Sequence, residues 1–260
     1  MKPETVESAS RALELASDVE TAHATRRQVQ PLRGIRGASQ REIAKAADEI
    51  WRTDPPSLPA DQPLLDRLFN TAWEDGLVAV ALLAALVPDS PGAAATLAEE
   101  WLARTDDLLT ADALGWMVVG PSAIAGKTGA LDLVERFRDG GPIEKRAAVL
   151  AGLAWTPSPL EGASAAAVRA RLGTPIVQWV AELDQNAVCI LLNGFVHDLD
   201  PGVQKGLRRL IRRFAEVDPD SALAWSARVR GGLPPLLRDE LRAIKAAVAK
   251  RARRAAAEVE

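Results

Sequence analysis

Four arginines near the C-terminal end of the chain have the spacing that suits contact with phosphate groups. Arg208 and Arg212 are four residues apart, as are Arg209 and Arg213, so each pair lies on one face of a helix. Like charges placed in this way repel by roughly a few tenths of a kcal/mol, and bound phosphates would remove that repulsion. The alternative is a solvated face that pairs with acidic residues elsewhere. We favour phosphate contact.

The charge of the chain is divided unevenly along its length. Residues 203–254 contain fourteen Lys and Arg against five Asp and Glu, a net charge of +9, whereas residues 1–202 sum to −10. The overall charge of −3 hides this division. A basic segment on an otherwise acidic protein attracts polyanions to one part of the surface. The sequence therefore favours a polyanionic partner at the C-terminal end.

Two other kinds of site are not supported by the sequence. Lys127 follows a stretch that invites comparison with a nucleotide-binding loop, but a Walker A loop has four residues between its glycines. Gly120 and Gly126 are separated by five. The only histidines, His23 and His197, lie far apart in the sequence, so a zinc site is not expected. We predict no metal and no nucleotide cofactor.

The cysteine content and the apolar runs indicate the compartment. A single cysteine, Cys189, excludes internal disulfides and fits a reducing compartment. It lies in an apolar run and is predicted to be a small buried hydrophobe. The N-terminus lacks the apolar stretch of a signal peptide, and the longest apolar run, residues 77–87, is too short to cross a bilayer. We predict a cytoplasmic protein that does not bind membranes.

The elements that must position the arginines are short helices. Ala and Leu dominate the composition and Tyr is absent, which is typical of helical proteins. Ser39 followed by Glu42 predicts a capping box, and Asp200 before Pro201 predicts the start of the helix that carries the arginines. Periodicity predicts helices over residues 5–27, 38–52, 61–72, 74–87, 91–104, 107–117, 127–138, 142–155, 163–172, 174–183, 185–197, 200–215, 219–230 and 233–255.

Helices of this length with short connections usually form antiparallel pairs. Pairs of about 35–45 residues with an apolar seam are typical of HEAT-like repeats. We predict an all-α fold, a HEAT-like helical-repeat solenoid of about six to seven antiparallel helix pairs, without any sheet. It would form one domain over residues 1–260, with basic C-terminal repeats over residues 203–254. An irregular helical bundle is the alternative.

Five sequence blocks follow one another in an order that suggests a family. They are residues 34–51 (GIRGASQREIAK followed by EIW), 75–83 (DGLVAVALL), 101–112 (WLARTDDLLTAD), 144–149 (EKRAAV) and 203–212 (VQKGLRRLIR). Together they resemble the AlkD-type DNA alkylation repair proteins, which are bacterial HEAT-like-repeat DNA glycosylases. That family is understood to wrap duplex DNA in a concave basic surface. It excises positively charged alkylated purines without flipping the base into a pocket.

The resemblance implies roles for individual residues. Asp112 aligns with the catalytic Asp, and a carboxylate beside the developing positive charge of the sugar lowers the barrier to purine release. Arg146 aligns with an Arg that binds DNA backbone nearby. Leu108 and Arg209 stand where the family has the two tryptophans that face the lesion, so we expect excision to be slow or absent. Trp116 follows Asp112 by four residues, which places it near that acid on a helix.

Two functions stay open at this point. The first is binding of duplex DNA by an alkylation repair protein, with or without weak excision of N-alkylpurines. The second is a non-enzymatic HEAT-repeat scaffold with a protein partner, because a curved solenoid serves that role equally well. Positive charges on the concave face would favour DNA, and positive charges scattered on the convex face would favour a scaffold. The predicted DNA contacts are Arg146, Lys205, Arg208, Arg209, Arg212 and Arg213.

Overall fold

The computed structural model describes residues 1–29, 31–157, 182–229 and 232–257, with side chains described as far as residue 250. Every regular element among these residues is a helix, which confirms the prediction of an all-α helical-repeat fold. The two helices predicted over residues 163–172 and 174–183 fall on a stretch that lies almost wholly outside the described residues.

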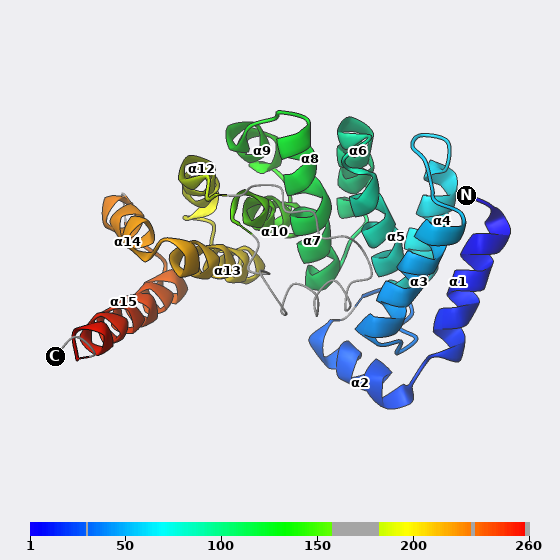
Figure 1. Cartoon of the computed structure of the whole chain (residues 1–260), viewed down its shortest axis with the longest axis horizontal. Helices are drawn as coiled ribbons and strands as arrows, with labels where there is room; N and C mark the ends of the chain where they lie inside the picture. Colours follow the sequence, from blue (N-terminus) through cyan, green and yellow to red (C-terminus); the bar gives the residue numbers. More distant parts are fainter. Residues whose placement is uncertain (30, 158–181, 230–231, 258–260) are drawn as a thin grey trace.

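The helices form an arch of two layers (Figure 1). Consecutive helices of the inner layer pack against one another, and each has a partner in the outer layer. The inner layer consists of α3 (Gln40–Thr53), α5 (Trp73–Leu86), α7 (Leu108–Leu114), α10 (Pro142–Ala151) and α13 (Pro201–Val217). The outer layer consists of α1 (Pro3–Leu15), α4 (Gln62–Thr71), α6 (Pro91–Leu102), α9 (Ala130–Phe137), α12 (Gln185–Phe195) and α14 (Pro219–Arg228).

Besides the short 3-10 helix η2 (Gly152–Trp155) and a π turn described below, three further helices belong to the described part of the array. They are α2 (Val19–Gln28), α8 (Gly120–Ala125) and α15 (Pro235–Ala257). Helices α2 and α15 extend from the two lower ends of the arch in Figure 1, near its concave side. Helix α15 packs against both α13 and α14, so the C-terminal helix is attached to the helix that carries the predicted arginines.

One face of α13 packs into the core of the protein. Leu207, Leu210, Ile211 and Phe214 are completely buried, and they lie on the face opposite the arginines. Asp200 accepts hydrogen bonds from two backbone N–H groups in the first turn of this helix, as the Asp–Pro pair predicts. The apolar stripe and the cap together fix the direction in which the arginines point.

The first predicted helix, residues 5–27, is divided into α1 and α2. Asp18 interrupts it, because its carboxylate accepts a hydrogen bond of 2.6 Å from Thr21 N and so caps a new helix. The backbone oxygen of Asp18 would lie 2.1 Å from a Cβ atom at Gly37, where φ is +92°. Only glycine fits there, and this close crossing holds the loop before α3 against α2.

The helix predicted to end at residue 117 continues instead to Ala125. A π-helical turn, η1 (Gly115–Val119), joins α7 to α8. Pro121 cannot donate a backbone hydrogen bond, which explains why the helix adjusts here. Added Cβ atoms at Gly115 and Gly120 would lie 2.3 and 2.4 Å from carbonyl oxygens of α10. These two glycines therefore let α10 approach closely, and α10 becomes the support of the site described below.

The segment Leu108–Ala125 is also the one described helix that is long and apolar enough to cross a membrane by length and composition. In this protein it is a central element of the arch, and 61% of it is buried by the rest of the chain. Core helices of water-soluble proteins have the same composition.

Candidate functional site

Three of the residues singled out in the sequence meet at one point between α7, α10 and α13. Arg146 donates from Nε to Asp112 Oδ1 at 2.5 Å and from Nη2 to Asp112 Oδ2 at 2.8 Å. Arg209 donates from Nη1 to Asp112 Oδ2 at 3.1 Å. The side chains of Asp112 and Arg146 are each only 9% exposed. The carboxylate is therefore held by three N–H groups, and the two guanidinium groups leave the cluster with a net positive charge.

Arg146 lies inside the protein rather than on its surface. Besides the two bonds to Asp112, it donates from Nη1 to the carbonyl oxygen of Gly202 at 2.6 Å. It therefore ties α7 and α10 to the first turn of α13. Little of its guanidinium is left to meet a phosphate, so the structure gives this residue a positioning role within the cluster.

A cleft of about 180 Å³ opens beside Asp112. Its walls come from α3, α5, the α7–η1 helix and α13. Trp116 lines it, as does Asp112, so the expected neighbourhood of these two residues is confirmed. Trp73 also lines the cleft, and sequence reasoning missed it because nothing in the local pattern sets it apart from the core tryptophans. Its indole N–H has no acceptor among the described residues.

Two of the predicted arginines are bound to one acid on the C-terminal helix. Arg212 donates from Nε to Glu240 Oε1 at 2.8 Å and from Nη2 to Oε2 at 2.9 Å, and Arg208 Nε also donates to Oε2. The side chain of Glu240 is 5% exposed. The hydrogen bonds from Arg212 and Arg208 lower the pKa of this carboxyl against the effect of burial, and the same contact raises the pKa of Arg212.

The outer edges of these arginines stay accessible. The side chains of Arg208, Arg209 and Arg212 are 44%, 53% and 55% exposed, although each contacts an acid. Arg213 is more enclosed, because it donates to Glu216 and to the carbonyl oxygen of Pro157. Lys205 is exposed on the same helix. The described structure thus brings together four of the six predicted DNA contacts at its surface.

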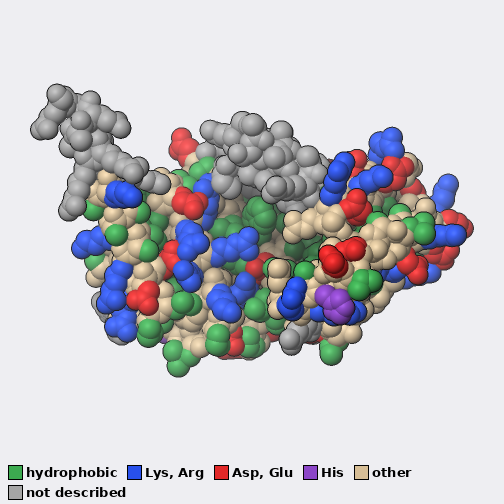
Figure 2. Space-filling model, turned by 90° about the horizontal axis from the view of Figure 1, so that it is seen from below, with side chains coloured by type: hydrophobic (Ala, Val, Ile, Leu, Met, Phe, Trp, Pro, Cys, Tyr) green, Lys and Arg blue, Asp and Glu red, His purple; other side chains and the backbone are tan. Residues whose placement is uncertain are grey.

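The basic side chains gather on the face seen from the concave side of the arch. Figure 2 shows this face, with Lys and Arg side chains concentrated over its C-terminal part, where α13 and α15 lie. Acidic side chains are interspersed but fewer there, in keeping with the sequence. Positive charge gathered on one face is the distribution expected where the partner is a polyanion.

Comparison with protein families agrees with the sequence blocks. A family model for the DNA alkylation repair enzyme matches residues 9–246. The chain belongs to the DNA alkylation repair enzyme family. No curated protein matches it significantly. Membership of this family connects the chain with DNA repair. The matched residues include the whole of the site just described.

Leu108 and Arg209, which the resemblance places where the family has its two tryptophans, lie in different surroundings. Leu108 begins α7 and packs close to Gly202 at the start of α13. Arg209 occupies the other position and binds Asp112. Trp73 of α5 and Trp116 of the π turn line the cleft together with Asp112.

Two further candidates for chemistry give no site in the described part of the chain. No cluster of three His, Cys, Asp or Glu side chains that could hold a metal ion is found among the described residues. Cys189 is partly buried rather than fully buried, and its burial raises the pKa of the thiol despite the nearby positive charge of Arg228. A thiol with a raised pKa is a weak nucleophile.

Proposed function

We propose that this repair protein binds duplex DNA through the basic face of α13 and α15, and that its excision of alkylated purines is weak or lost. The observation that carries the proposal is the state of Asp112. Its carboxylate accepts three N–H bonds from two arginines. The acid that would stabilise a cationic sugar is already neutralised, while basic groups stay accessible beside it.

The contacts with acids do not prevent the arginines from binding phosphate. A guanidinium carries five N–H donors in a planar fork, and Arg209 uses only one of them on a described acceptor. Arg208 and Arg212 share a single Glu240, so this group of three keeps a net positive charge. Half-exposed guanidinium edges of this kind bind phosphate oxygens in a bidentate manner.

Weak excision follows from the charge around Asp112. Electrostatic stabilisation by a well-placed group is worth about two to three orders of magnitude in rate. Here Arg146 and Arg209 outnumber the acid, so a cationic purine would be brought toward a positively charged cluster. Arg209 also stands where the family has an aromatic contact to the lesion. A slow residual rate is the most that this arrangement supports.

The binding proposal is tested by duplex affinity across a salt series. Each neutralised phosphate contributes about 0.9 to the slope of log affinity against log salt concentration. Replacing the three exposed arginines of α13 by Gln should flatten this slope by about one unit for each phosphate that the variant no longer binds. The variant carries Arg208→Gln, Arg209→Gln and Arg212→Gln.

A matched control replaces three arginines of the outer part of the arch that are also about half exposed and paired with acids. The control carries Arg67→Gln, Arg104→Gln and Arg136→Gln. We expect it to bind duplex DNA with the slope of the parent. Equal slopes for the parent and the α13 variant would show that α13 is not the DNA surface.

The excision proposal is tested by base release from methylated duplex DNA. We expect release by the parent to be close to the spontaneous rate and little changed in Asp112→Asn. The fold of the variant has to be checked first by circular dichroism, because Asp112 also has a structural role. Rapid release by the parent that a folded Asp112→Asn variant loses would show that the carboxylate still acts in catalysis.

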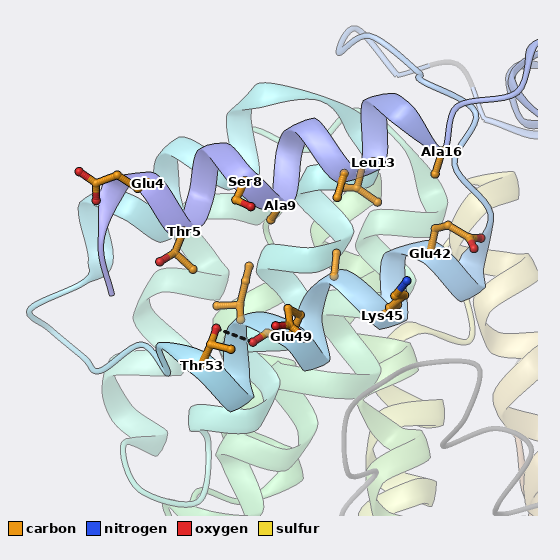
Figure 3. A pocket seen from close by; sticks show the side chains of 13 residues that line it. Glu4, Thr5, Ser8, Ala9, Leu13, Ala16, Glu42, Lys45, Glu49 and Thr53 are labelled. Atoms are coloured by element: carbon orange, nitrogen blue, oxygen red, sulfur yellow. Dashed lines mark hydrogen bonds between the residues drawn. The ribbon is translucent and has the colours of Figure 1, made fainter.

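One observation favours the scaffold function as a second candidate. A cleft of about 490 Å³ lies between α1 and α3 (Figure 3), away from all the predicted site residues. Small side chains such as Ala9 and Ala12 line it together with Glu42, Glu49 and Lys45, and such a groove suits a partner helix. A parent protein that binds no duplex DNA even at about 50 mM salt would leave this as the preferred function.

A further inference from the structure

We propose that the groove between α1 and α3 binds the last part of helix α15, residues 245–257, of a second copy of this chain. The groove lies at the N-terminal end of the arch, whereas α15 extends from the C-terminal end (Figure 1). The helix therefore reaches the groove of another copy and not its own. This head-to-tail contact goes beyond the proposed DNA binding and does not depend on it.

The groove has the dimensions and the small side chains that accommodate a helix. Its volume is about 490 Å³, and its described lining comes from α1, with the C-cap of that helix, and from α3. These helices have 13 and 14 residues, so each is about 20 Å long. Ala12 is exposed and Ala16 is half-buried in the wall of the groove. Side chains of this size allow a third helix to come close.

The charge of the groove is negative. Glu4 lies at one end and Glu42 at the other, with Glu49 between them (Figure 3). Lys45 is the one basic residue in the described lining, so three acids and one base give a net charge of −2. Glu49 pairs with Arg52, but both side chains are more than half exposed. Exposed pairs of this kind bind weakly, so the Glu49 carboxylate is able to accept a different cation.

The last part of α15 complements the groove in charge, length and side-chain size. Residues 245–257 contain five Lys and Arg and no Asp or Glu, and all the other residues are alanines except one valine. They belong to one helix and span about 20 Å, which is the length of α1 and of α3. A helix with a charge of +5 and few large side chains therefore matches an acidic groove with alanines in its wall.

This part of α15 contributes little to holding the helix on its own chain. The first half of α15 packs on α13 and α14, and its Leu237 and Leu241 are buried in the core. Farther along, Lys245 and Lys250 are exposed and Val248 is only half-buried. An isolated helix of about a dozen residues is marginally stable in water, so binding to a groove would stabilise it.

The groove and the helix are different surfaces, so the contact is heterologous. A copy that binds one neighbour through its groove still offers its α15 to the next. Association of this kind continues into open chains and does not stop at a dimer. Because the attraction is largely between exposed charges, salt weakens it: the screening length falls from about 10 Å at 0.1 M salt to about 3 Å at 1 M.

The experiment uses two variants of the full chain, each of which keeps one half of the contact. Ala12→Trp fills the groove, and Lys245→Glu combined with Lys250→Glu reverses charge on α15. In sedimentation velocity without nucleic acid at low salt, the parent should form species larger than a dimer at about 100 µM, where micromolar contacts are largely occupied. Each variant alone should stay monomeric. An equal mixture of the two should form a dimer and nothing larger.

The matched control is Ala93→Trp, which places the same side chain at an exposed alanine of α6 and should associate as the parent does. Glu4→Lys combined with Glu49→Lys replaces Ala12→Trp if that variant does not fold, and it should give the same results. We also expect Ala12→Trp to bind duplex DNA with the affinity of the parent, because the groove lies away from α13.

The outcomes separate failure of this inference from failure of the proposed function. A monomeric parent at about 100 µM, a groove variant that associates as the parent does, or a mixture that stays monomeric each overturns the head-to-tail contact. A monomeric parent that still binds duplex DNA with the expected salt dependence leaves the DNA surface intact. Head-to-tail association by a parent that binds no duplex refutes the DNA surface and supports the contact.

Discussion

The pair formed by Asp112 and Arg146 gives the most direct test of what the acid does. Both side chains are almost fully buried, and two hydrogen bonds of 2.5 and 2.8 Å join them. Removing one partner of such a pair leaves an uncompensated buried charge, which typically costs about 3–5 kcal/mol. We therefore expect Asp112→Leu and Arg146→Met each to lower the free energy of unfolding by about 3 kcal/mol or more.

The double variant shows whether Asp112 mainly stabilises the fold or is kept for catalysis. Replacing both members of a buried pair by apolar residues is often close to neutral, so Asp112→Leu combined with Arg146→Met should cost much less than the sum of the single effects. Arg209→Gln is the control. Its contact with Asp112 is half exposed, and such pairs contribute about 0–1 kcal/mol.

Urea denaturation followed by circular dichroism measures these differences, since the midpoint shifts while the slope stays constant for a pure stability change. Single variants that cost less than about 1 kcal/mol, with additive effects in the double variant, would refute the reasoning. Asp112 would then contribute little to the fold, and its position would need a catalytic explanation. A large coupling energy between the substitutions at Asp112 and Arg146 would confirm that this pair stabilises the fold.

Three further predictions concern α15 and the π turn. Glu240→Gln should strengthen duplex binding at a fixed salt concentration, because Arg208 and Arg212 lose the acid that competes with phosphate for them; an unchanged affinity would contradict this. The pKa of Glu240 is lowered in the folded protein. The contribution of this carboxylate to stability is therefore present above its ordinary pKa of 4.5 and disappears as the pH falls through the lowered value. The urea midpoint of the parent should fall in this acidic range more than that of Glu240→Gln. Gly115→Ala should cost about 1–3 kcal/mol in urea denaturation, because its Cβ would lie 2.3 Å from a carbonyl oxygen of α10, whereas Gly92→Ala meets no atom within 4 Å and should not destabilise the protein.

The local features of α13 were predictable from sequence, because they depend on neighbours along the chain. The Asp200–Pro201 start, the buried stripe through Leu210 and the arginine face all follow from helical periodicity and capping. The acid that binds two of those arginines was not predictable. Glu240 is about thirty residues away, and only the packing of α15 on α13 brings it there.

The surroundings of Asp112 were likewise predictable only in part. Its closeness to Trp116 follows from a spacing of four residues. Its contact with Arg146 depends on the close approach of α10 to the π turn. Gly115 lies inside the predicted helix, whereas Gly120, which also permits this approach, has the local character of a helix breaker. The sequence therefore predicts a link where the structure has a continuous helix. Trp73 reaches the cleft from a third helix, and no local pattern indicates that contact.

The π turn also has a consequence for insertions and deletions in this family. An α-helix advances by about 100° per residue, and η1 fits one residue more into its turn than the helices on either side. We expect a deletion of one residue within Gly115–Val119 to be absorbed as an ordinary α-helical turn. The helix would then keep Asp112 and Gly120 in their present relation, whereas a deletion in the α-helical residues between Asp112 and η1 would rotate Asp112 by about 100° relative to Gly120 and move it away from Arg146. The rotation of this helix about its axis, and not only its composition, therefore decides whether Asp112 contacts Arg146 and Arg209.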